Sequence, residues 1–442
     1  MTFTRRDFMG LTVAGIASTA AVSREMIPKN DSYPRLVQGP MLGYSTPSGI
    51  RIWCRTNGEH NVSIQVDSDK YFSNPKVMSE LQASKDNNFI TVHNIQGLNK
   101  NTNYYYRVLV NNGNHLGSWA RRVPDLSFLP PFEFKTAPSP DSKSNFRVGF
   151  GSCARLQSDP LQPIWDAVMV WKPELFFWLG DNIYADTGSS RIRTGRYQQQ
   201  REVASLQPLI RSVPQLAIWD DHDFGYNDTD STFIYKKESL IDFKQFWPNP
   251  GYGLPEAPGV FFSYEYSGVE FIFLDVRYYR EPKDKPDHSN KTMLGKSQKE
   301  WLKNRLNRSS GLFKVIVSGV GWSNTEGDKH DSWSGYKNER DEIFKHIVDN
   351  EISGVVLLSG DTHYGEVNVV PWSDEGGYDL YNLVSSPLAQ NTRSALQDEE
   401  PEIRARAPYS GSTNFGIIDF VLDNSRPYLE FNLVNVQGGG VW

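Results

Sequence analysis

Short apolar runs that stop abruptly at a polar residue recur in the second half of the chain. Residues 176–179 form such a run, which ends at Gly180 and Asp181. A run of this length, bounded by glycine, is typical of a strand that is buried on both faces. In sheets of α/β proteins, ligands bind beyond the carboxyl ends of such strands. This segment therefore predicts a buried strand that leads into a functional site.

Four further predicted strands also end on side chains that can bind metal ions. These strands and their terminal residues are 146–153 with Cys153, 216–223 with Asp220, Asp221, His222 and Asp223, 271–277 with Asp275 and Arg277, and 355–363 with Asp361 and His363. Taken singly, each such residue is more often a turn, cap or core residue. Taken together, so many negative charges at one sheet edge would repel one another without a cation. The cluster predicts a metal site.

The rest of the pattern divides the chain into two folded parts. Residues 33–136 show short alternating strands separated by turn residues, which predicts a β-sandwich domain. Residues 97–108 resemble the tyrosine corner of fibronectin type III domains, and there Tyr104 is expected to return its hydroxyl to the backbone. A connector rich in proline and serine, residues 136–143, follows.

Residues 145–442 alternate apolar strands with helical stretches, a pattern that predicts a layered α/β domain. The predicted helices cover residues 161–172, 197–212, 239–246, 296–307 and 339–350. A β-hairpin is predicted from residues 416–422 and 428–434.

The amino terminus predicts an export signal in place of a folded element. Arg5 and Arg6 precede an uncharged run over residues 11–22, the pattern of a twin-arginine signal that covers residues 1–23. We expect cleavage near Arg24 and a mature protein in the periplasm or outside the cell. No other segment is long and apolar enough to predict a membrane helix.

Composition narrows the choice of partners. With 22% charged residues and a net charge of -6, the chain has no basic surplus, so a nucleic-acid-binding surface is not expected.

The two cysteines are Cys54, which alternates as a strand residue, and Cys153 at a strand end, so no disulfide is expected. We expect a monomer.

Five motifs along the chain resemble, in order, those of the alkaline phosphatase D (PhoD-like) family of metallophosphoesterases. They are residues 151–153, 180–186, 219–223, 274–277 and 359–363. The resemblance covers nearly the whole chain. It implies a metallophosphoesterase-type β-sandwich flanked by helices, behind a fibronectin-III-like all-β domain, and a hydrolase that acts on phosphate mono- or diesters.

The resemblance also implies two kinds of metal ion. Cys153, Asp181, Tyr184 and His363 would hold ferric iron (Fe3+), which suits thiolate and phenolate donors. Asp181 would bridge to calcium (Ca2+), and Asp221, Asn182 and Asp361 would complete a shell made of oxygen atoms only.

Two residues are expected to contact the substrate. His222 is placed to protonate the leaving oxygen. Arg277 can offer its planar guanidinium to phosphate oxygens, although an arginine there could equally be a partner of Asp275. Residues 331–336 resemble a segment of that family that lies near the entrance to the substrate site, and they could also pack against the sheet.

The sequence is compatible with two functions. One is a secreted phosphoric ester hydrolase with iron and calcium, and the other is a secreted, calcium-stabilised surface-binding protein without catalysis. A structural calcium site has no use for Cys153, Tyr184 and His222 together, so the residues favour the hydrolase.

Overall fold

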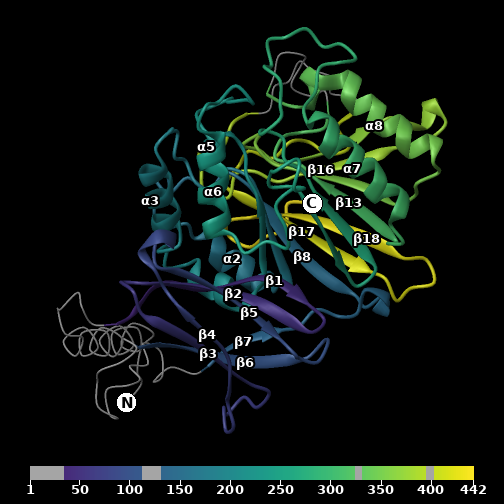
Figure 1. Ribbon diagram of the computed structural model, residues 1–442. Helices are drawn as coiled ribbons and strands as arrows, with labels where there is room; N and C mark the ends of the chain where they lie inside the picture. The colour runs from purple at the N-terminus through teal and green to yellow at the C-terminus, as the bar shows by residue number, and fades with distance from the viewer. Residues whose placement is uncertain (1–33, 112–130, 324–330, 395–402) are drawn as a thin grey trace, which may run out of the picture.

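The computed structural model describes residues 34–111, 131–323, 331–394 and 403–442 (Figure 1). The predicted export signal lies outside these residues. The described helices include none that is long and apolar enough to cross a membrane.

The first part of the chain forms two antiparallel sheets. One has the order β1 (Leu36–Thr46), β2 (Gly49–Thr56), β5 (Ile90–Gln96), and the other β4 (Lys76–Gln82), β3 (Asn61–Asp67), β6 (Asn103–Asn111), β7 (Phe132–Lys135). Alternate residues such as Ile50 and Ile52 of β2 face Ile64 of β3 in a shared core, as the period of two dictates. The hydroxyl of Tyr104 accepts a hydrogen bond of 2.9 Å from the backbone N–H of Asn99, which confirms the expected tyrosine corner.

The second part is a sandwich of two larger sheets. The five-stranded sheet has the order β10 (Gln215–Ile218), β9 (Leu175–Leu179), β8 (Phe146–Gly151), β17 (Asn414–Val421), β18 (Tyr428–Asn435). The six-stranded sheet has the order β11 (Phe262–Tyr266), β12 (Val269–Phe273), β13 (Phe313–Val317), β14 (Val355–Ser359), β16 (Leu380–Val384), β15 (Glu366–Val370). Strands β8 to β10 run parallel to one another, as do β12, β13, β14 and β16. The predicted terminal hairpin is confirmed as β17 and β18.

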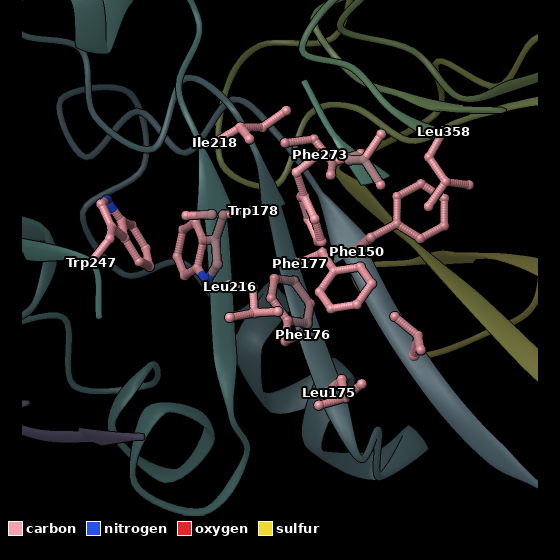
Figure 2. Packing of buried hydrophobic residues seen from close by; sticks show 14 of the residues in the cluster. Phe150, Leu175, Phe176, Phe177, Trp178, Leu216, Ile218, Trp247, Phe273 and Leu358 are labelled. Atoms are coloured by element: carbon pink, nitrogen blue, oxygen red, sulfur yellow. The ribbon is translucent and has the colours of Figure 1, made fainter. Parts of the chain in front are cut away.

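The core lies between these two sheets. Figure 2 shows Phe150 and Phe177 of the five-stranded sheet in one apolar cluster with Phe273 and Leu358 of the six-stranded sheet. The ring of Phe177 lies 5.0 Å from that of Phe273. Its neighbour Phe176 points the other way, toward Trp165 of α2 (Ile164–Trp171), because successive strand residues face opposite sides. The buried run that ends at Gly180 is therefore covered on both faces, as its composition predicts.

Helices cover the outer faces of the sandwich (Figure 1). Helices α7 (Gly295–Arg308) and α8 (Lys337–Asp349) share a second apolar cluster with outward residues of β12 to β14, including Ile272 and Leu357. Buried residues of the other four helices belong to the main apolar cluster together with residues of the five-stranded sheet. These helices are α3 (Ser190–Gln200), α4 (Gln207–Ser212), α5 (Asp221–Phe224) and α6 (Lys236–Phe246). Short 3₁₀-helices are η1 (Lys85–Asn87), η2 (Pro140–Ser142), η3 (Trp333–Tyr336) and η4 (Ser373–Glu375).

The single helix predicted over residues 197–212 is wrong. Helix α3 ends at Gln200, and α4 begins separately at Gln207. Pro208 stands in the first turn of α4, where its missing N–H does no harm, whereas it would interrupt a continuous helix.

The two parts of the chain are joined by hydrogen bonds from the first part to α4 and α6. The indole N–H of Trp53 donates to the backbone carbonyl of Gln245 at 2.7 Å. The hydroxyl of Tyr106 donates to the backbone carbonyl of Arg211 at 2.8 Å. The domain boundaries deduced from the sequence stay a prediction, although β1 to β7 fall within residues 33–136 and the later strands within 145–442.

Candidate metal centre

The predicted ligands gather where the two facing sheets end, and not at the edge of one sheet as the sequence suggested. Strands β8, β9 and β10 of the five-stranded sheet lead to Cys153, Asp181 and Asp221. Strand β14, which leads to Asp361 and His363, belongs to the six-stranded sheet. Sheets packed face to face keep nearly aligned strand directions, so the carboxyl ends of both sets of parallel strands meet at one end of the sandwich.

The backbone takes an uncommon conformation at these strand ends. Cys153, Asp181, Asp361 and His363 have φ angles of 62°, 51°, 72° and 59°, in the left-handed region that residues other than glycine rarely adopt. Each costs about 1–3 kcal/mol and persists only where the surroundings fix it, typically at functional sites. Gly180 has a φ of 103°, and a Cβ there would lie 2.5 Å from Cβ of Asp220, so the tight turn before Asp181 requires glycine.

One group of side chains can hold a metal ion between β8, β9 and β14. The ligand atoms of Cys153, Asp181 and His363 lie within 4.8 Å of one another, and Sγ of Cys153 lies 3.6 Å from Oδ2 of Asp181. The hydroxyl of Tyr184 lies 3.2 Å from Nε2 of His363. Two atoms that bind one ion at about 2.0–2.4 Å are at most about 4.8 Å apart, so these separations fit a shared ion.

A second group shares Asp181 with the first. Ligand atoms of Asp181, Asp221 and His222 lie within 4.8 Å of one another. Next to Asp181, the side-chain N–H of Asn182 donates to the carbonyl of Ile218 at 2.9 Å, while its Oδ1 is buried without a hydrogen-bond partner. An unpaired buried oxygen is costly, and a cation would satisfy it.

Asp361 stands apart from the other predicted ligands. Its side chain is half-buried, and its carboxylate does not belong to the close groups of ligand atoms found among the described residues. Its backbone N–H donates to Oγ of Ser152 at 3.0 Å, and its carbonyl lies 3.8 Å from Sγ of Cys153. Asp361 therefore lies beside the first group, at the end of β14.

The electrostatics of the cluster favour a cation. Burial raises the pKa of Asp181 well above its usual value, and the negative charges of Asp221, Cys153, Asp220 and Asp361 raise it further. Burial also raises the pKa of the Cys153 thiol to about 12 and that of the Tyr184 phenol well above its ordinary value. A bound cation would stabilise the deprotonated forms that metal ligands need.

His222 lies at the edge of the second group, with a partner that the sequence reasoning did not assign. Its Nδ1 lies 2.5 Å from Oδ1 of Asp186, and its ring lies 4.0 Å from the ring of Tyr184. Burial lowers the pKa of His222, but the hydrogen bond to Asp186 and the charges of Asp221, Asp186 and Asp220 outweigh burial and raise it. Asp186 is the last residue of the motif over residues 180–186. Its place in this motif is the sequence signal that could have identified it as a functional residue.

Arg277 lies under the cluster and is fully buried. Its Nε donates to Oδ1 of Asp220 and its Nη2 to Oδ2 of Asp331, both at 2.5 Å, and Nη2 lies 4.0 Å from Oδ1 of Asp221. The predicted alternative, in which its guanidinium pairs with Asp275, is wrong. Asp275 instead accepts the backbone N–H of Arg277 at 3.0 Å, because its carboxylate lies against the turn after β12.

The segment over residues 331–336 combines two kinds of contact. Asp331 pairs with Arg277 and also with Arg280, at 2.5 Å. Trp333 and Tyr336 are fully buried in the apolar cluster beneath α8, so their packing accounts for them. The sequence reasoning did not find Asp331 as the partner of Arg277, because 54 positions separate them.

Facing sheets flanked by helices, with carboxylate, thiol, phenol and imidazole groups at their carboxyl ends, define a metallophosphoesterase-like phosphatase. The sequence model of the PhoD-like phosphatase family matches residues 148–420, and that of the family's N-terminal domain matches residues 20–121. The chain belongs to the PhoD-like phosphatase family, as the motifs suggested, and is a phosphoric ester hydrolase.

Comparisons with individual proteins agree with this assignment. Alkaline phosphatase D of Bacillus subtilis (strain 168) is 25% identical over an alignment of length 435 that covers 82% of this chain and 71% of that protein. A solved structure of PhoD superposes with a TM-score of 0.76 at 18% identity over 94% of both chains. A purple acid phosphatase from yellow lupin (Lupinus luteus) seeds gives a TM-score of 0.63 at 13% identity over 93% of this chain and 73% of that one. At these identities the two structures bear on the fold alone, and they agree with the predicted fold class.

Proposed function

We propose that this chain hydrolyses phosphate mono- or diesters with the help of ferric iron and calcium. Cys153, Asp181, Tyr184 and His363 would hold the iron, and Asp181, Asn182 and Asp221 the calcium. The contact of Asp361 with the calcium stays a prediction, because its carboxylate lies outside both close groups of ligand atoms among the described residues. The observation that carries the proposal is the pair of close ligand groups that share Asp181. A thiol and a phenol in the first group suit ferric iron, whereas the carboxylates of Asp181 and Asp221 in the second suit a hard cation.

The residues around the two groups supply the rest of the chemistry. When bound, the two cations would activate a water molecule and neutralise charge on the phosphoryl group. His222, protonated through its contact with Asp186, would donate a proton to the leaving oxygen. The contact between Arg277 and the substrate phosphate stays a prediction. The guanidinium of Arg277 pairs with Asp220 and Asp331.

Metal content and colour test the proposal. A ferric ion bound by phenolate and thiolate absorbs visible light, so the purified protein is expected to be coloured and to contain iron and calcium by elemental analysis. Chelation of calcium should abolish hydrolysis of para-nitrophenyl phosphate and of its bis ester but keep the colour, because oxygen ligands hold a labile ion. A colourless protein that holds only zinc, with activity indifferent to calcium, would contradict it.

We further propose that the protein is exported in its folded state through the twin-arginine pathway. The proposal rests on Arg5 and Arg6 ahead of the apolar run. Replacement of both arginines by lysine should retain the protein in the cytoplasm, as fractionation and immunoblotting would report. Unchanged export of that variant would contradict the proposal.

A further inference from the structure

Two loops run side by side next to the first ligand group. One follows β8 and the other follows β16. The backbone N–H of Arg155 donates to the carbonyl of Ala389 at 2.9 Å, and that of Ala389 donates to the carbonyl of Cys153 at 3.0 Å. Oγ of Ser158 donates to Oε1 of Gln390 at 2.8 Å. The two loops therefore form a single, cross-linked wall beside the site.

Arg155 projects from this wall over a predicted metal ligand. Its guanidinium carbon lies 5.1 Å from the centre of the Tyr184 ring. Its Nε is buried and has no hydrogen-bond partner. Within the described part of the chain, the Arg155 side chain forms no ion pair. A buried guanidinium nitrogen without a partner is costly, which suggests that a ligand completes its contacts.

Arg393 comes from the second loop and lies against His363. Its backbone N–H donates to the carbonyl of His363 at 3.0 Å, and its side chain is exposed. This backbone contact holds Arg393 next to a predicted metal ligand.

The contrast with Arg277 shows which cations are available to a substrate. Arg277 is saturated by Asp220 and Asp331 beneath the site. Arg155 is half-buried and Arg393 is exposed, and the described residues offer neither of them a carboxylate in ion-pair contact. Guanidinium groups recognise phosphate oxygens through parallel N–H donors.

We propose that Arg155 and Arg393 together bind the non-bridging oxygens of the substrate phosphate and make the site prefer dianionic monoesters to diesters. This inference rests on the proposed function. A phosphate monoester, with a second pKa of about 6, carries nearly two negative charges at pH 8, whereas a diester carries one. Two cations at the site therefore stabilise the bound monoester more than the bound diester.

Binding of inorganic phosphate tests the pair without any turnover. Calorimetric titration of the protein as purified should show about ten- to a hundredfold weaker binding in Arg155→Gln, the usual cost of a lost charged hydrogen bond. Arg393→Gln should lose less, about two- to tenfold, because solvent and salt screen an exposed charge. Arg155→Lys should recover part of the loss.

Arg426→Gln is the matched control. Arg426 is an exposed arginine in the turn between β17 and β18, where β17 pairs with the start of β8 and so ends far from Cys153. Its replacement should leave phosphate affinity unchanged. Unchanged affinity in Arg155→Gln, Arg393→Gln and the double variant would overturn the proposal. So would a shifted visible band in Arg155→Gln with normal phosphate affinity, because Arg155 would then only position Tyr184.

Steady-state kinetics test the substrate preference. For the double variant, kcat/KM should fall about tenfold more for para-nitrophenyl phosphate than for bis(para-nitrophenyl) phosphate. Equal losses for the two esters would overturn the preference for monoesters. If the unaltered protein hydrolyses neither ester, the proposed function fails, and the phosphate titration still decides whether the arginines bind the anion.

Discussion

The two ring nitrogens of His222 face different carboxylates: Nδ1 lies 2.5 Å from Oδ1 of Asp186, and Nε2 lies 4.0 Å from Oδ2 of Asp181. Asp186 therefore fixes a proton on Nδ1 and leaves Nε2 on the side of the predicted metal ligands. A histidine oriented in this way can hold a second proton on Nε2 and release it toward a leaving group above the cluster.

Replacement of His222 should affect esters according to their leaving groups. His222→Ala is expected to lower kcat by about 10²- to 10⁴-fold for an alkyl phosphate, the usual contribution of a general acid. The loss should be smaller for para-nitrophenyl phosphate, whose leaving group needs no proton. Metal content measured by elemental analysis should not change. Equal losses for both esters would show that His222 has another role.

Asp186 should act only through His222. Asp186→Asn keeps the shape of the side chain but removes its charge, and it should lower kcat for an alkyl phosphate by about 10- to 100-fold. In a His222→Ala background the same change should have almost no further effect, because coupled residues are not additive. The double-mutant cycle measures this coupling, and independent, additive losses would contradict the pairing.

Asp331 should be important for stability through the buried arginines that it joins. Burial raises the pKa of Asp331, but the charges of Arg277 and Arg280 outweigh burial and lower it to about 2. Asp331→Asn would leave both guanidinium groups buried with less compensation, at an expected cost of about 3–5 kcal/mol in the free energy of unfolding. Denaturant titration measures this cost.

Asp349→Asn is the control for that experiment. The same substitution there removes an exposed pair with Lys345, with side chains 52% and 71% exposed. Such a pair contributes at most about 1 kcal/mol. Similar losses in the two variants would contradict the importance assigned to burial of the Asp331 pairs.

The sequence predicts the parts of this site that depend on local pattern. The apolar run before Gly180 predicts a buried strand, because five consecutive apolar side chains must be buried on both faces of a sheet. Asp181 follows directly after Gly180. The same reasoning locates Cys153, Asp221 and His363 at strand ends. Local pattern does not say which sheet a strand joins, so the division of these residues between two sheets was not predicted.

Long-range pairing is the part that the sequence leaves open. Arg277 lies 57 positions from Asp220 and 54 from Asp331, so nothing in its neighbourhood revealed that its guanidinium is occupied. Asp275, two positions away, was the obvious partner, but it accepts backbone N–H groups instead. Only the packing of separate elements decides such contacts.

His93 should make the stability of the protein depend on pH. It is fully buried in the first part of the chain, where Nδ1 lies 2.9 Å from Oγ of Ser79 and Nε2 lies 3.1 Å from Oγ1 of Thr91. Burial lowers its pKa from 6.5 to about 4. Between these values the unfolded chain binds a proton that the folded chain excludes, so stability is full above pH 6.5 and falls as the pH drops toward 4.

The size of this effect follows from the shift, since one pKa unit corresponds to about 1.4 kcal/mol. Between pH 7.5 and pH 5.0 His93 should contribute a loss of about 2 kcal/mol. His93→Gln, which keeps a polar side chain but cannot titrate, should lose about that much less than the unaltered protein over the same interval. His288→Gln, at an exposed histidine, is the control and should behave like the unaltered protein. Urea denaturation at the two pH values measures the difference, and the same pH dependence with and without His93 would show that this buried ring is not the group that limits stability in mild acid.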